Sequence, residues 1–289
     1  MVTMTYSHPD ALVSSDWLAD HFKTPNVRVL DGTYFLPNVP RNAFDEFQAE
    51  HIPGAAFFDI DDIKDPNNSL PHMLPTPEIF SSKIRKLGIK NTDRIIIYDR
   101  MGFFSAPRVW WTFRIFGHEN VAILDGGLYK WLAEGRPTSG SENIWQPSHF
   151  LASFNADMVR NSKQIMENLK SKNELVIDAR PSDRFEGTAP EPREGLASGH
   201  IPASLNLMPS QFVSRDTHTL LPGDAIAEQF KDIGITPDTP ILTTCGSGVA
   251  ASAITYVRYL ITGKVAPVYD GSWSEWGAIE HAPIVTGKS

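Results

Sequence analysis

Residues 241–252 read ILTTCGSGVAAS and pass from a short β-prone run, through a glycine-rich loop, into a segment of helical character. A strand that leads through a tight turn into a helix is the building unit of α/β folds with a parallel sheet. In such sheets, residues that carry chemistry gather at the carboxyl ends of the strands. Cys245 stands at that position and is the only cysteine of the 289 residues. The stretch therefore predicts a fold class and a candidate reactive thiol.

The segments around this unit occur twice, in the same order. The first half contains VRVLDGTY (27–34), AEHIPGAAFFDI (49–60), RIIIYDR (94–100) and VAILDGGLYKW (121–131), and the second contains ELVIDARP (174–181), SGHIPASLNL (198–207), PILTTCGS (240–247) and VAPVYDGSWSEW (265–276). Two segments between these apolar runs, 77–88 and 223–234, show helical spacing and end at glycine. The duplication predicts two α/β domains, each a mainly parallel sheet flanked by helices. We expect the first domain over residues 10–140, a linker over 141–155 and the second domain over 156–286.

The composition is that of an ordinary globular protein, with 41% hydrophobic and 21% charged residues and a formal net charge of −8. A single cysteine excludes an internal disulfide and a thiolate metal cluster. The acidic balance argues against nucleic acid as a partner. No apolar run has the length of a membrane span, and the N-terminal segment has neither a signal-peptide core nor an arginine-rich transit pattern. We therefore expect a cytoplasmic protein without a membrane or nucleic-acid partner.

The two halves can be compared with each other, because residues that both contain are expected to be scaffold. The shared residues are Asp31 and Asp178, His51 and His200 in the His-Ile-Pro motifs, and the Asp-Gly pairs at 125–126 and 270–271. Cys245 is not shared, since aligning RIIIYD with PILTTC places Asp99 opposite it. A cysteine that only fills a core would more naturally be replaced by Ala, Val or Ser. This difference favours a chemical role for Cys245.

The loop after Cys245 is suited to holding an anion. Its glycines allow a tight turn that aims successive N–H groups inward, and the N-terminus of the following helix completes the nest. Such surroundings favour the thiolate form of a cysteine. Cysteine phosphatases need a histidine before the cysteine and an arginine six positions after it, whereas this chain has Thr244 and Ala251 there. Sulfur transfer through a cysteine persulfide needs neither residue and is the chemistry that fits better.

Several motifs together resemble the tandem-domain sulfurtransferases of the rhodanese superfamily, and most closely those that use 3-mercaptopyruvate. The segments that carry the resemblance are AEHIPGAAFFDID, HMLP, RVWWTFRIFGHENVAILDGG, VIDARPSDRFEG, PEPREG, GHIPAS and CGSGV, spread over residues 10–285. The resemblance implies two rhodanese-like domains, of which the first lacks the catalytic cysteine. It also implies that no metal or organic cofactor is required.

The same resemblance implies roles for residues outside the loop. Arg184 in DRFEG and Arg193 in EPREG would bind the donor, because the planar guanidinium holds a carboxylate or keto oxygen with paired bonds. Ser247, with His72 of HMLP and Asp61 of FFDID, would form a relay for the proton lost from the donor thiol. His72 and Asp61 lie in the first half, so we expect the active site in the cleft between the domains.

The loop sequence bears on the choice of donor. Thiosulfate enzymes of the superfamily typically carry basic residues after the cysteine, whereas Gly246, Ser247 and Gly248 are neutral here and fit the mercaptopyruvate pattern. The backbone of Gly246, Gly248, Val249 and Ala250 would cradle the persulfide. The family usually has a threonine where this chain has Ala250, so a hydroxyl is lost beside the persulfide while the backbone N–H remains.

These observations lead to one main hypothesis and two alternatives. The main one is a ping-pong transfer from 3-mercaptopyruvate through a Cys245 persulfide, releasing pyruvate, to cyanide, a small thiol or a thioredoxin-like dithiol protein. The first alternative is a thiosulfate:cyanide sulfurtransferase. The second is a non-enzymatic persulfide carrier or redox module.

Overall fold

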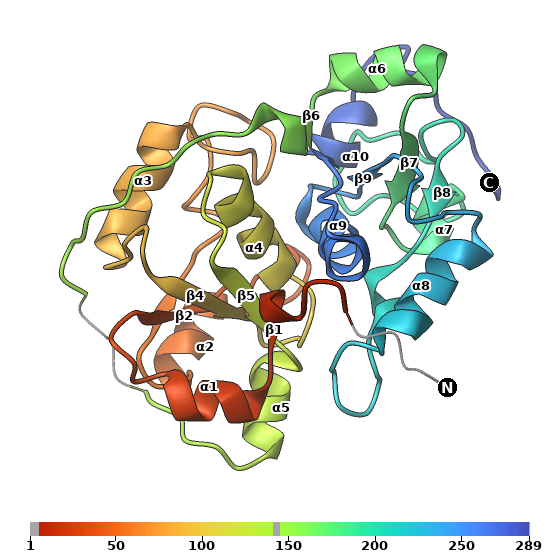
Figure 1. Ribbon diagram of the computed structural model, residues 1–289. Coiled ribbons are helices and arrows are strands. Elements are labelled where there is room, and N and C mark those ends of the chain that lie inside the picture. The colour runs from red at the N-terminus through yellow and green to blue at the C-terminus, as the bar shows by residue number, and fades with distance from the viewer. Residues whose placement is uncertain (1–5, 141–144, 289) are drawn as a thin grey trace.

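The computed structural model describes residues 6–140 and 145–288 and shows two domains of the same design (Figure 1). The first contains η1 (Pro9–Ala11), β1 (Leu12–Val13), α1 (Ser15–His21), β2 (Val27–Asp31), α2 (Ala43–Ala49), β3 (Ala55–Phe57), α3 (Pro77–Lys86), β4 (Arg94–Tyr98), α4 (Ala106–Ile115), β5 (Val121–Leu124) and α5 (Gly127–Ala133). The second contains η2 (Ala156–Met158), β6 (Val159–Arg160), α6 (Ser162–Ser171), β7 (Leu175–Asp178), α7 (Ser182–Phe185), β8 (Leu205–Asn206), η3 (Pro209–Phe212), α8 (Gly223–Asp232), β9 (Ile241–Thr244), α9 (Val249–Thr262), β10 (Val268–Tyr269) and α10 (Ser272–Trp276).

Each domain is built on a five-stranded parallel sheet. The strand orders, β1-β5-β4-β2-β3 and β6-β10-β9-β7-β8, are equivalent. Strands that are buried on both faces read as continuous apolar runs, and Ile95–Tyr98 of β4 is wholly buried. The α/β fold with two tandem domains is therefore confirmed. The four central strands β2, β4, β7 and β9 also lie where the apolar runs predict them.

One inner strand of the second sheet is shorter than predicted. VAPVYD (265–270) forms only the two-residue strand Val268–Tyr269. Pro267 precedes it and has no N–H to donate to a neighbouring strand, so the ladder begins one residue later. The two-residue strands β1 and β6 were not predicted at all, because alternation cannot be recognised over two positions.

Helices α4 and α9 pack against each other between the two domains (Figure 1). One hydrophobic cluster includes buried residues of both domains, among them Trp110 of α4 and Tyr256 of α9, whose rings meet edge to face at 5.0 Å. These helices follow β4 and β9 directly. The loops at the carboxyl ends of these two strands therefore both lie at the domain interface, where Cys245 and Asp99 stand.

The shared histidines act as scaffold in the same way in both domains. His51 and His200 are buried, and their Nδ1 atoms lie 2.7 and 2.8 Å from the carbonyl oxygens of Phe47 and Phe185. Each imidazole also stacks on the ring of that phenylalanine.

The shared aspartates at the Asp-Gly turns do more than was predicted. They end strands, as expected, but each also accepts a hydrogen bond from the other domain. The Leu220 N–H donates to Asp125 Oδ1 at 2.8 Å, and the Leu74 N–H donates to Asp270 Oδ2 at 2.7 Å. A comparison of the halves in sequence shows that these residues are repeated but not which domain they contact.

In the described ranges, no helix is both long and apolar enough to cross a membrane.

Candidate active site at the domain interface

Cys245 lies at the point where β9 turns into α9, and its exposed fraction is 3%. Gly248 has a φ of +77°, which glycine adopts without steric cost, and caps the first turn of α9. The Trp273 and Ser274 N–H groups of α10 donate to the carbonyls of Cys245 and Gly246, both at 2.9 Å. In the described part of the chain, the amides of residues 246–248 have no hydrogen-bond acceptor. These N–H groups, with the N-terminus of α9, can receive an anion.

The equivalent loop of the first domain holds an anion of its own chain. One carboxylate oxygen of Asp99 accepts a hydrogen bond from the Met101 N–H at 2.9 Å. The other accepts from the N–H groups of Phe104, Ser105 and Ala106, each at 2.8 Å. The Asp99 carboxylate therefore occupies the amide nest that the strand-to-helix turn creates. By analogy, the shorter turn of the second domain is suited to a negative group at the position of Cys245.

Three polar side chains form a chain of contacts beside Cys245. His72 Nδ1 lies 3.0 Å from Ser247 Oγ, and His72 Nε2 lies 3.3 Å from Asp61 Oδ1. His72 is 3% exposed, whereas the Asp61 side chain is 54% exposed. The hydrogen bond to His72 and its nearby charge lower the pKa of Asp61. When Nε2–H donates to Asp61, the Nδ1 atom of His72 is left to accept from the Ser247 hydroxyl.

Two arginines lie beside the loop on the other side of the thiol. A Cβ built on Gly246 would be 3.4 Å from Arg184 Nη2 and 3.9 Å from Arg193 Nη1. Arg184 is held by an ion pair with Glu191, whose carboxylate oxygen is 2.5 Å from Nη2. Burial raises the pKa of the Tyr34 hydroxyl to about 12, against the opposing charge of Arg193. The site thus offers two guanidinium groups next to the thiol.

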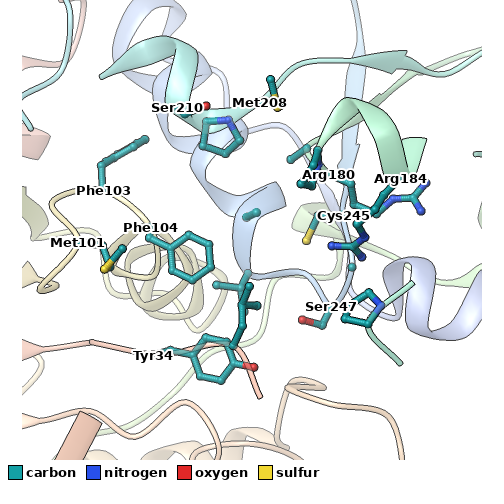
Figure 2. A pocket seen from close by; sticks show the side chains of 18 of the residues that line it. Tyr34, Met101, Phe103, Phe104, Arg180, Arg184, Met208, Ser210, Cys245 and Ser247 are labelled. Atoms are coloured by element: carbon teal, nitrogen blue, oxygen red, sulfur yellow. The ribbon is translucent and has the colours of Figure 1, made fainter. Parts of the chain in front are cut away.

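A cavity of about 560 Å³ connects these groups. One side is formed by Cys245, Ser247, Arg184 and Arg193, together with Val249 and Ala250. The opposite side carries Met101, Phe103 and Phe104 from the loop after Asp99. Figure 2 shows the Cys245 sulfur between Arg184 and these apolar side chains. Seven of the ten residues predicted for the site, Gly246 among them, line this cavity. Gly248 adjoins it in the same loop, and His72 and Asp61 connect to it through Ser247.

Comparison with known proteins identifies the family. The model of the rhodanese-like domain matches twice, at residues 14–134 and 161–279. The chain belongs to the rhodanese family. The mitochondrial thiosulfate/3-mercaptopyruvate sulfurtransferase 1 of Arabidopsis thaliana is 40% identical over 99% of this chain and 81% of its own. Human 3-mercaptopyruvate sulfurtransferase is 40% identical over 92% of this chain and 91% of its own. The crystal structure of the Escherichia coli 3-mercaptopyruvate sulfurtransferase SseA aligns with a TM-score of 0.83 and 36% identity, over 92% of this chain and 99% of that one.

This rhodanese-family chain contains a further repeat that the comparison of its halves in sequence missed. His72 in HMLP and His218 in HTLLP both have a positive φ, of 61° and 57°. His72 Nδ1 faces Ser247, two residues after Cys245, and His218 Nδ1 lies 3.0 Å from the carbonyl of Met101, two residues after Asp99. The His-x-Leu pattern in both segments was the signal for this equivalence. If shared residues were always scaffold, this repeat would have argued against a functional role for His72. The two histidines differ in the group that each contacts, so the contact, and not the repetition, indicates the role.

Other residues of the rhodanese site carried no recognised signal. Tyr34 lines the cavity and meets the His72 ring edge to face at 4.8 Å. Glu191 also pairs with Arg180, whose buried guanidinium binds Asp178 as well. These residues lie in loops and act through tertiary contacts, so neither periodicity nor spacing reveals them.

Proposed function

We propose that this protein transfers sulfur from 3-mercaptopyruvate, through a persulfide on Cys245, to a thiol or cyanide acceptor and releases pyruvate. The observation that carries the proposal is the 3.0 Å approach of His72 Nδ1 to Ser247 Oγ, two residues after the thiol. A thiol donor must lose its S–H proton when its sulfur is transferred, whereas thiosulfate has no such proton. A proton relay at this position therefore favours a thiol donor.

In the first half-reaction, the donor carboxylate and ketone bind to Arg184 and Arg193. The Cys245 thiolate attacks the donor sulfur, so that an S–S bond forms and the bond from sulfur to C3 breaks. The electron pair of that bond moves into the ketone and gives the enolate of pyruvate. The S–H proton passes through Ser247 to His72, with Asp61 stabilising the imidazolium, and is returned to C3.

In the second half-reaction, an acceptor removes the outer sulfur of the persulfide. The terminal sulfur anion lies in the amide nest of residues 246–250 until a thiolate or cyanide attacks it. A dithiol protein of the thioredoxin type would then release the sulfur as sulfide by closing its own disulfide. Neither half-reaction requires a metal or an organic cofactor.

A donor panel with the purified protein tests this proposal. We expect a higher kcat/KM with 3-mercaptopyruvate than with thiosulfate, and a higher value with thiosulfate would establish the second candidate. That candidate is favoured by the double name of the Arabidopsis relative. A protein that accepts sulfur from a partner, but turns over neither small donor, would be the non-enzymatic carrier.

Cys245→Ser should abolish turnover with either donor, because the hydroxyl cannot form a persulfide. Mass spectrometry after donor addition should show a gain of one sulfur atom on the wild-type peptide containing Cys245 and none on the variant. Turnover that survives in the variant would contradict both enzyme hypotheses.

A cytoplasmic location remains part of the proposal. One relative is named as mitochondrial, so fractionation of cells that produce the tagged chain at its native level is the measurement that decides.

A further inference from the structure

Arg108 is a buried cation that contacts the backbone of His72 and the backbone of the loop that carries Ser247. It lies in the first turn of α4 and is 2% exposed. Its Nη1 atom donates to Asp270 Oδ1 at 2.8 Å and lies 3.4 Å from the carbonyl oxygen of Gly248. Its Nη2 atom donates to the carbonyl oxygen of His72. One guanidinium from the first domain therefore joins the histidine segment to the loop that contains the thiol.

Asp270 completes this connection from the second domain. Its other carboxylate oxygen accepts from the Leu74 N–H at 2.7 Å, so residues 72 and 74 are both tied to the Arg108–Asp270 pair. His72 needs such support, because its φ of +61° is one that residues other than glycine adopt rarely. The pair thus fixes the backbone from which the imidazole projects toward Ser247.

The loop has space for this arginine because residue 248 is glycine. A Cβ at Gly248 would lie 2.7 Å from Arg108 Nη1, which is too close for two unbonded atoms. Glycine is therefore needed here both for its φ and for the approach of the guanidinium.

The duplicated chain supplies an internal comparison. In the other half, the Leu220 N–H donates to Asp125, as the Leu74 N–H donates to Asp270 here. His218 lies against Met101, as His72 lies against Ser247. In the ranges that the structure describes, however, no arginine hydrogen-bonds to Asp125 or to the carbonyl of His218. The arginine is present on the side that has the thiol and the hydroxyl, and not on the side that has Asp99.

We propose that Arg108, paired with Asp270, is a positioning residue that sets the separation between His72 Nδ1 and Ser247 Oγ. The inference rests on the proposed function, because it assigns Arg108 to the proton relay of the first half-reaction. Arg108 does not touch the donor; it acts through the carbonyls of His72 and Gly248.

The test separates the two half-reactions in Arg108→Met. We expect pyruvate formation in a single turnover to slow by roughly 10- to 100-fold, because misplacing a catalytic group by about 1 Å costs about that much. The donor KM should change by less than about threefold, since Arg184 and Arg193 remain. Sulfur release from the persulfide, loaded beforehand, should also change little, because that step does not use the relay. Arg114→Met is the matched control: Arg114 is also in α4 and lies over the Tyr259 ring of the other domain. Among the described residues, its side chain contacts Trp110, Tyr259 and the Glu119 carbonyl, none of which is a site residue.

A double variant separates positioning from folding. Arg108→Met alone leaves Asp270 as a buried charge without its partner, which lowers stability. Arg108→Met combined with Asp270→Asn removes both charges, and its melting temperature should recover while pyruvate formation stays slow. Recovery of the rate together with the melting temperature would overturn the inference, because Arg108 would then be purely structural.

A spectroscopic readout keeps this inference separate from the choice of donor. If the wild-type protein does not turn over 3-mercaptopyruvate, the proposed function fails, but the contact between His72 and Ser247 can still be measured. In protein labelled with ¹⁵N-histidine, the His72 imidazole signals, assigned with His72→Gln, should move in Arg108→Met and not in Arg114→Met. Unchanged His72 signals would overturn the positioning role whatever the donor is.

Discussion

The Ser247 hydroxyl is the group that should distinguish one donor from another. Replacing it with alanine interrupts the contact with His72 but leaves Cys245, the arginines and the amide nest in place. We expect Ser247→Ala to lower kcat with 3-mercaptopyruvate by roughly 100-fold, the lower end of what a positioned acid or base contributes. With thiosulfate, which has no S–H proton, the rate should remain within a few-fold of wild type. Steady-state rates with both donors measure this, and equal losses would contradict a relay.

Arg184 should act on donor binding. Its guanidinium lies beside Gly246 and shares a carboxylate, Glu191, with the buried Arg180. In Arg184→Gln we expect KM for 3-mercaptopyruvate to rise at least about tenfold, the equivalent of losing one charge-assisted hydrogen bond. Unfolding midpoints should change little, since Arg180 still neutralises Glu191. An unchanged KM would remove Arg184 from the donor site.

At the scale of single elements, the sequence predicted what local chemistry determines. The runs VRVLD and RIIIY became β2 and β4 because residues buried on both faces must be apolar throughout. The strand-to-helix turn at Cys245 was predicted because glycine and a helix start are local signals. The tertiary contacts of HMLP could not be predicted in this way, because they come from Asp270 and Arg108, far away in the chain.

The turn after β5 should make stability depend on pH. Burial raises the pKa of Asp125 to about 6, against the hydrogen bond from Leu220 and the charge of Lys130, compared with an ordinary value of 3.8. The folded protein therefore binds this proton more tightly than the unfolded chain. Its contribution to stability is complete below about pH 4 and is lost as the pH rises through about 6, by at most about 3 kcal/mol.

Asp125→Asn tests this sign. Asparagine keeps the acceptor for the Leu220 N–H but does not ionise. We expect the variant to be more stable than wild type at pH 8, with the difference shrinking toward zero at pH 4. Urea unfolding at the two pH values gives the free energies, and a difference that does not change with pH would show that Asp125 is not the titrating group.

At the scale of the whole molecule, the shared core should make the two domains unfold together. Trp110 is fully buried, and its ring lies 5.0 Å from that of Tyr256 and 5.2 Å from that of Tyr259, both in α9. Trp110→Ala should lower the free energy of unfolding by about 3–5 kcal/mol. Tryptophan fluorescence and far-UV circular dichroism should still give one coincident transition. Two separate transitions in the wild-type protein would contradict a common core.

The placement of one domain on the other was the part of the site that the sequence alone did not supply. The resemblance to sulfurtransferases led us to expect a site in an interdomain cleft, but the contacts across it depend on the packing of α4 on α9. Arg108 illustrates the difficulty, because in sequence it is one arginine in an apolar helix. Only the folded arrangement shows that its three acceptors come from two domains.

The reciprocal contacts of the two histidine segments have the geometry of an isologous interface. His72 reaches the position two residues after Cys245, His218 reaches the position two residues after Asp99, and each Asp-Gly turn binds the opposite segment. In a symmetric homodimer, such an interface would create two equal reaction centres. Here the two halves belong to one chain, and the carboxylate of Asp99 occupies the amide nest of the first domain. If Cys245 carries the persulfide as proposed, each chain loads a single sulfur atom, although its architecture contains two places for one.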